Sequence, residues 1–96
     1  MRVRLIPSPL KTKKWRMLFS QNDFEKAVDF GARGASDFTL HKDEFRKQQF
    51  LSRFRKLIVR YEDNPMTPMT LSTWILWNRP TIEQSLKDYK QHFKFS

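Results

Sequence analysis

The stretch from Trp74 to Thr81 limits the possible folds more than any other part of this sequence. It holds two of the three tryptophans, Trp74 and Trp77, and the longest unbroken apolar run. A tryptophan brings a large apolar area and an indole N–H that needs a partner. Both must therefore lie in the core or on a surface that a partner covers. Pro80 cannot continue a helix, so one helix is expected to end here and Thr81 to cap the next.

Two short helices are expected around this corner. The first spans about 68–77, with Thr67 as its N-cap, and it is apolar on more than one side, which is typical of a buried helix. The second spans about 81–94. It carries Leu86 and Tyr89 on one apolar face, and its other side chains are mainly charged or polar.

A longer helix is expected over about 44–60. Phe50 and Phe54 belong to a stripe of apolar side chains at helical spacing, which we interpret as the face that packs on the core. Basic residues occur throughout this segment, whereas acidic residues stand only at its start, which suits the helix dipole.

A β-hairpin is expected ahead of the helices. Apolar and polar residues alternate over 15–19 and again over 24–30, on either side of a short polar turn. The resulting apolar face needs a cover, because an isolated hairpin is only marginally stable in water. The sequence thus predicts an α+β fold, with an N-terminal β-hairpin packed against about three helices. The expected core residues are Trp15, Phe30, Phe50, Phe54, Trp74, Trp77, Leu86 and Tyr89.

Residues 1–14 are expected to form a basic extended arm, and residues 15–96 a single α+β domain. Pro7 and Pro9 favour an extended path for the arm. The first sixteen residues contain several lysines and arginines but no acidic residue, and such arms often bind phosphate backbones.

The charge balance indicates an acidic partner. The chain has 19 Lys and Arg against 10 Asp and Glu, a net charge of +9. Nucleic acid, an anionic membrane surface and the acidic face of another protein all fit such a charge. The candidate contact residues for a partner protein or nucleic acid are Arg2, Arg4, Lys11, Lys13, Lys14, Arg16, Arg46, Lys47, Arg53, Arg55, Lys56 and Arg60.

No residue set predicts catalysis. The chain has no cysteine, and its two histidines, His41 and His92, are far apart in sequence. No paired carboxylates, P-loop or nucleophile elbow stands out. We therefore expect no enzyme activity, cofactor, metal or small-molecule substrate. No apolar run approaches the roughly 18 residues of a membrane span, so none is expected.

Four stretches carry a resemblance: KKWR at 13–16, VDFGARG at 28–34, SDFTLHKD at 36–43 and WILWNRPT at 74–81. Over about residues 12–90 the sequence resembles a family of small basic proteins of unknown function from large eukaryotic double-stranded DNA viruses. The resemblance implies a viral origin and a compact module, and it implies no catalytic residues.

Two functions are expected from this resemblance together with the charge. The first is a structural virion protein, a minor capsid or capsid-associated component that contacts other capsid proteins. The second is a non-specific DNA-binding or genome-packaging protein of the same viruses. Either would place the protein in the virion and, during assembly, in the host cytoplasm or viral factory.

Overall fold

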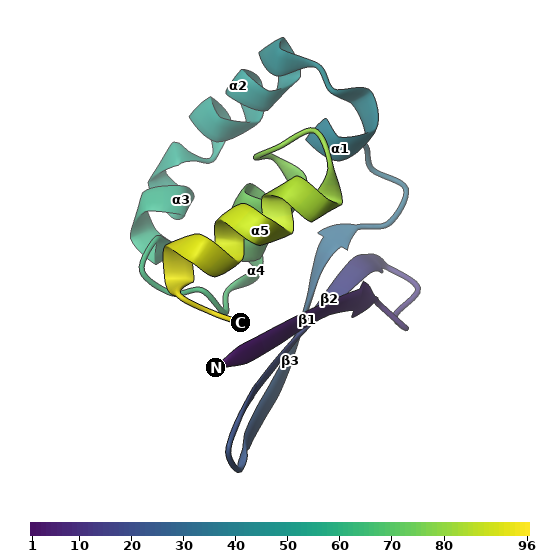
Figure 1. The fold of residues 1–96 in the computed structure, drawn as a ribbon. Coiled ribbons are helices and arrows are strands. Elements are labelled where there is room, and N and C mark those ends of the chain that lie inside the picture. Colours follow the sequence, from purple (N-terminus) through teal and green to yellow (C-terminus); the bar gives the residue numbers. More distant parts are fainter.

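The protein has two layers, a three-stranded antiparallel sheet and a group of helices on one of its faces (Figure 1). The computed structural model describes residues 1–96. In chain order the elements are β1 (Arg2–Pro7), β2 (Lys13–Gln21), β3 (Phe24–Ala32), α1 (Phe38–His41), α2 (Glu44–Arg53), α3 (Arg55–Tyr61), α4 (Pro68–Leu71), the π-helical turn η1 (Ser72–Leu76) and α5 (Ile82–Phe93). The predicted α+β class is confirmed.

The predicted hairpin is formed by β2 and β3. Their antiparallel register places Met17 opposite Val28 and ends at a tight turn after Gln21. Asn22 supplies the left-handed backbone of this turn, with φ of 52°. Because side chains alternate between the two faces of a strand, Met17 and Val28 share the inner face with Phe19 and Phe30, and all four are buried.

The N-terminal segment belongs to the sheet and is not a separate arm. Its backbone is extended, as predicted, but residues 2–7 form β1 and pair antiparallel with β2. Val3 faces inward and is buried, whereas Arg2 and Arg4 lie exposed on the opposite face. The alternation of basic and apolar residues over 2–5 is itself a strand signal, and the nearby prolines and the high charge hid it.

Both ends of the chain meet at the outer edge of β1 (Figure 1). The Val3 N–H donates to the Ser96 carbonyl at 2.9 Å, and the Ser96 N–H donates to the Met1 carbonyl at 3.1 Å. This pairing occupies part of a strand edge that would otherwise be open.

The core lies between the inner face of the sheet and the helices α4, η1 and α5. Its buried apolar residues are Val3, Met17, Phe19, Val28, Phe30, Leu71, Ile75, Leu76 and Tyr89. The corner between η1 and α5 follows the sequence prediction: the Thr81 hydroxyl accepts from the Gln84 N–H at 3.2 Å and caps α5. Thr67 likewise caps α4, with Pro68 at its start.

The predicted core residues divide into three groups. Phe30 and Tyr89 are completely buried. Trp15, Trp74, Trp77 and Leu86 are half-buried and pack against the core from its edge. Phe50 and Phe54 are also half-buried but lie outside the core, so their assignment to it was wrong.

The predicted long helix is divided at Phe54. The backbone of this residue, at φ −103° and ψ 12°, leaves the helical region between α2 and α3. Hydrogen bonding nevertheless continues across the break, from the Phe54 N–H to the Phe50 carbonyl and from the Ile58 N–H to the Phe54 carbonyl. The two helices therefore form one slightly interrupted rod.

Gly31 allows η1 to approach the sheet closely. Its φ is +78°, a conformation that strains any other residue. A Cβ built on Gly31 would also lie 2.9 Å from a methyl of the buried Leu76. Backbone conformation and space thus both require glycine here.

A partly exposed ion pair lies on the open face of the sheet. Arg16 donates through Nε and Nη2 to the two carboxylate oxygens of Asp29, each at 3.0 Å, and the Ser8 hydroxyl donates to Asp29 at 2.6 Å. The hydrogen bonds from Arg16 and then Ser8 hold the pKa of Asp29 below its usual range.

We expect Gly31→Ala to lower the free energy of unfolding by about 2–3 kcal/mol, because it adds both backbone strain and overlap with Leu76. Gly34→Ala is the matched control, since Gly34 also has a positive φ but an added Cβ there would have no neighbour within 4 Å. It should cost only about 1 kcal/mol. Urea denaturation measures both; equal losses would contradict the close-approach argument.

We expect Asp29→Asn to remove part of the stability at neutral pH. A carboxylate with a lowered pKa in the fold stabilises it above its unfolded pKa of about 3.9, and this contribution disappears as the pH falls through the folded pKa. The melting temperatures of wild type and Asp29→Asn should therefore differ at pH 7, and the difference should shrink as the pH falls below the unfolded pKa and through the lowered folded pKa. Asp63→Asn removes a carboxylate that makes no ion pair and should leave the wild-type profile unchanged.

Candidate functional site

The surface with the strongest functional signal is the rod of α2 and α3, residues 44–61, which we call the α2–α3 ridge. It lies at the outer edge of the helical group, away from the sheet (Figure 1). No residue of α2 or α3 is buried. An amphipathic segment whose apolar residues are at most half-buried within its own chain is a candidate for burial by a partner.

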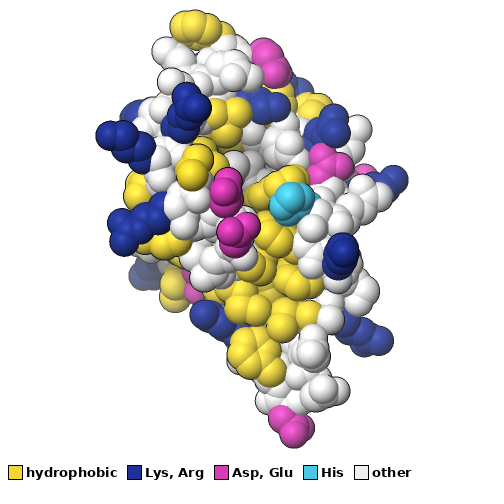
Figure 2. All heavy atoms as spheres, turned by 90° about the vertical axis from the view of Figure 1, so that its left-hand side faces the viewer, with side chains coloured by type: hydrophobic (Ala, Val, Ile, Leu, Met, Phe, Trp, Pro, Cys, Tyr) yellow, Lys and Arg dark blue, Asp and Glu magenta, His cyan; other side chains and the backbone are white.

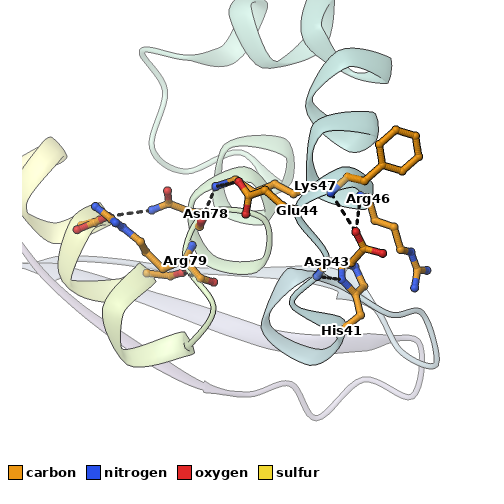
Figure 3. Close-up of polar contacts among 10 residues, drawn as sticks. His41, Asp43, Glu44, Arg46, Lys47, Asn78 and Arg79 are labelled. Carbon is orange, nitrogen blue, oxygen red and sulfur yellow. Dashed lines mark hydrogen bonds and ion pairs between the residues drawn. The ribbon is translucent and has the colours of Figure 1, made fainter.

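Local signals explain why this helix forms. Asp43 caps α2 by accepting from the backbone N–H groups of Phe45 and Arg46, and Glu44 follows in the first turn (Figure 3). Negative charge at this end and basic residues further along both suit the helix dipole. The Asp43 N–H in turn donates to His41 Nδ1 at 2.9 Å, which fixes the corner between α1 and α2.

His41 fills the space beneath this corner. Its ring lies 5.4 Å from that of Trp77 and 6.3 Å from that of Phe38. Because Nδ1 accepts a hydrogen bond, Nε2 carries the proton in the neutral ring. Nε2 is buried and has no hydrogen-bond acceptor, so His41 packs chiefly as an aromatic side chain.

Two contacts attach α2 to the body of the protein. The Phe50 ring stacks on Trp77 with centroids 4.4 Å apart and planes at 4°. Lys47 Nζ donates to the Asn78 carbonyl at 2.8 Å and lies 4.9 Å from the centre of the Phe38 ring (Figure 3). The Trp77–Asn78 corner is thus both the end of η1 and the support for the ridge.

Further along, α3 is held by the Thr70 hydroxyl, which donates to the Tyr61 carbonyl at 2.8 Å. Between these attachments, exposed apolar side chains alternate with cations (Figure 2). Phe45 is 70% exposed, Val59 55% and Leu57 41%. The sequence predicted that the apolar stripe of this segment faces the core, because the spacing is the same whether such a stripe meets the core or a partner.

The ridge carries nearly all of its charge uncompensated. Its cations are Arg46, Lys47, Arg53, Arg55, Lys56 and Arg60, and among them Lys47 alone has a carboxylate nearby, Glu44 at 3.8 Å. Arg53 and Arg60 instead lie over the rings of Phe54 and Tyr61.

A hollow of about 760 Å³ opens over α2, between Arg46 and Arg53 and above Phe50 and Trp77.

The structure separates the other predicted contact residues from the ridge. Arg2, Arg4 and Arg16 lie on the open face of the sheet, with Arg16 already paired to Asp29. Lys11 and Lys13 lie where β1 connects to β2, and Lys14 pairs with the buried Asp37 at 2.6 Å. The twelve residues thus do not form one continuous basic surface.

The described residues contain no group of three or more His, Cys, Asp or Glu side chains able to hold a metal ion. None of the helices is both long enough and apolar enough to cross a membrane.

Comparison with known proteins gives one match. The sequence model of a family described as "Family of unknown function (DUF5754)" matches residues 3–54, just over half of the 96-residue chain. The matched region contains the three strands, α1 and α2. No curated protein and no solved structure matches.

We expect Phe50→Ala to loosen the ridge without unfolding the protein, because the stack on Trp77 lies outside the core. Amide hydrogen exchange in α2 should become roughly tenfold faster, which corresponds to about 1.4 kcal/mol of lost local stability. Exchange in β2 should not change. Phe45→Ala removes an equally large ring that makes no such stack and should leave both rates as they are; acceleration across the whole chain would contradict this attachment.

Proposed function

The chain belongs to the DUF5754 family of unknown function, and we propose that it is a structural virion protein that works through protein–protein contacts. In this proposal it is a minor capsid or capsid-associated component of a large double-stranded DNA virus, without a catalytic role. The viral setting is supported by the sequence resemblance, and the mode of action by the α2–α3 ridge.

The observation that carries the proposal is the pattern of exposed apolar residues on the ridge. Phe45, Leu57 and Val59 lie among cations, and between 41% and 70% of each side chain is left exposed by the rest of the chain. Burying apolar surface contributes about 25 cal/mol per Å². A nucleic acid offers little to Leu57 and Val59, because bases stack on aromatic rings and Arg planes. An apolar groove on another protein suits them.

The cations specify the chemistry of that groove. Five of the six ridge cations, all except Lys47, have no carboxylate within ion-pair distance. A partner with acidic residues around an apolar groove would neutralise them. Charges at the rim of an interface mainly raise the association rate and fix the orientation, whereas the apolar contacts supply most of the affinity.

The second candidate is non-specific DNA binding or genome packaging. It is favoured by the same uncompensated cations, because phosphates would neutralise them and release counterions. Binding of this kind is independent of sequence and weakens steeply with salt. It depends on Arg53 and Arg60 and makes no use of Val59.

The two candidate functions are distinguished by which variant loses its binding partner. If the ridge binds protein, Val59→Ser should lower incorporation of the protein into particles several-fold, with its melting temperature unchanged because Val59 is more than half exposed. Quantitative mass spectrometry of purified particles measures incorporation. Thr73→Ser lies in η1, outside the ridge, and keeps the hydroxyl that donates to the Met69 carbonyl, so it serves as the neutral control.

The DNA candidate is tested in parallel with an Arg53→Gln/Arg60→Gln variant in salt-titrated gel shifts. Normal incorporation of Val59→Ser, together with tight DNA binding that this double variant abolishes, would replace the structural proposal with the DNA one. Absence of the protein from purified particles would overturn the virion role directly.

A further inference from the structure

A second hollow lies on a different side of the protein from the ridge, where the start of β2, α1 and the loop before α5 meet. It has a volume of about 550 Å³ and shares no residue with α2 or α3. Lys14, Trp15, Arg33, Leu40, Lys42 and Thr81 are among the residues that line it. Volumes of roughly 300–1,000 Å³ are typical of small-ligand sites.

The four stretches of the sequence resemblance meet at this hollow. Lys14 and Trp15 come from the first stretch, Arg33 from the second, Lys42 from the third and Thr81 from the fourth. The stretches are separated by up to 67 positions between Lys14 and Thr81 (81 minus 14). Only the fold brings them together.

The hollow has an excess of positive charge that the protein does not neutralise. Its one acidic side chain, Asp37, is buried and already paired with Lys14 at 2.6 Å. That pairing leaves Arg33 and Lys42 without a carboxylate. Two cations that line one hollow and have no carboxylate partner favour an anion there.

Arg33 is held rigidly without losing its charge. Its Nε donates to the Lys13 carbonyl at 3.1 Å, and its Nη2 donates to the carbonyls of Lys13 and Ser8, each at 3.0 Å. Nη1 makes no hydrogen bond within the protein and is free for a ligand. Lys42 Nζ is also held by a carbonyl alone, that of Thr39 at 3.2 Å. Preorganised cations bind an anion at a lower entropic cost.

Trp15, Leu40 and Ile82 give the hollow an apolar part beside its charged and polar residues. Trp15 is half-buried and Leu40 is 64% exposed. A lone phosphate would leave most of the volume and the indole surface unused. A ligand that joins a phosphate to a flat aromatic group would use both, because bases stack on aromatic side chains.

We propose that this hollow binds a nucleotide, with its phosphate at Arg33 and Lys42 and its base against Trp15. Free nucleotides and nucleotide units within a single strand share this chemistry. The site goes beyond the structural role of the ridge and does not depend on it.

The test is an NMR titration of the full chain with inorganic phosphate, deoxyadenosine monophosphate and a short oligo-deoxyadenylate. The three indole N–H signals act as internal probes. We expect the Trp15 signal to shift saturably with the nucleotide or the oligonucleotide, and less with inorganic phosphate. The signals of Trp74 and Trp77, which lie outside the hollow, should stay in place.

Lys42→Gln should weaken this binding roughly tenfold, since a hydrogen-bonded charge on a ligand phosphate is lost. Lys42 is exposed and bonds only one carbonyl, so the fold should survive the change. Lys56→Gln removes the same charge from the ridge and should have less than about a twofold effect. Arg33→Lys keeps the charge but loses the planar guanidinium group, so its effect on nucleotide binding tests the same site a second time.

The outcomes separate the sources of the nucleotide. Saturable binding of the monophosphate supports a free nucleotide ligand. Binding of the oligonucleotide alone, weakened by Lys42→Gln but not by Lys56→Gln, supports a nucleotide unit of a strand. Equal weakening by both variants, or no saturable Trp15 shift with any of the three ligands into the millimolar range, would overturn the proposal.

Discussion

The structure depends on how one face of a small sheet is covered. Three strands expose an apolar face that α4, η1 and α5 shield, and nine of the ten buried apolar residues lie at this interface, the tenth being Phe38 in α1. The approach is close because Gly31 has no side chain to hold Leu76 away. Tyr89 completes the interface from α5, where burial raises the pKa of its hydroxyl and this hydroxyl donates to the Pro65 carbonyl at 2.8 Å. Outside this layer, α2 and α3 find only a small apolar contact with the body of the protein, the stack of Phe50 on Trp77.

The ridge is therefore a consequence of the limited core. A chain of about 100 residues has little interior, and a second amphipathic rod cannot be buried within it. The rod is held instead by a ring stack, a lysine–carbonyl hydrogen bond and a threonine hydroxyl. Its remaining apolar side chains face solvent, and the cations between them keep the surface soluble. Attachment of this kind suits an element whose packing is completed by another molecule.

Sequence patterns predicted the elements whose signals are local. Alternation identified β2 and β3, and Thr67 and Thr81 identified the starts of two helices. Sequence patterns failed where the position of a side chain depends on residues that are distant in sequence. Phe50 and Phe54 have the spacing of residues on one face of a helix, but this spacing does not show whether that face meets the core or solvent. The sequence predicted an arm in place of β1 because Pro7 and Pro9 outweighed the alternation of Val3 and Leu5 with arginines. The hollow at Arg33 and Lys42 was not predicted, since its walls come from four separate stretches and only folding brings them together.

The hydrogen bonds between residues 1–3 and Ser96 close the backbone into a ring. The partner of one edge of β1, β2, is near in sequence, whereas the partner of the other edge, Ser96, follows α5 at the far end of the sequence. Phe95, next to the closure, packs against Phe19 and Tyr89 in the core. Fraying at either end would therefore open a path into the interior. A chain joined across this closure and opened at the Asn22 turn would keep the same strand pairing, because both points lie outside the core. The hydrogen bonds between Met1, Val3 and Ser96 thus connect the outer edge of β1 to the segment that follows α5.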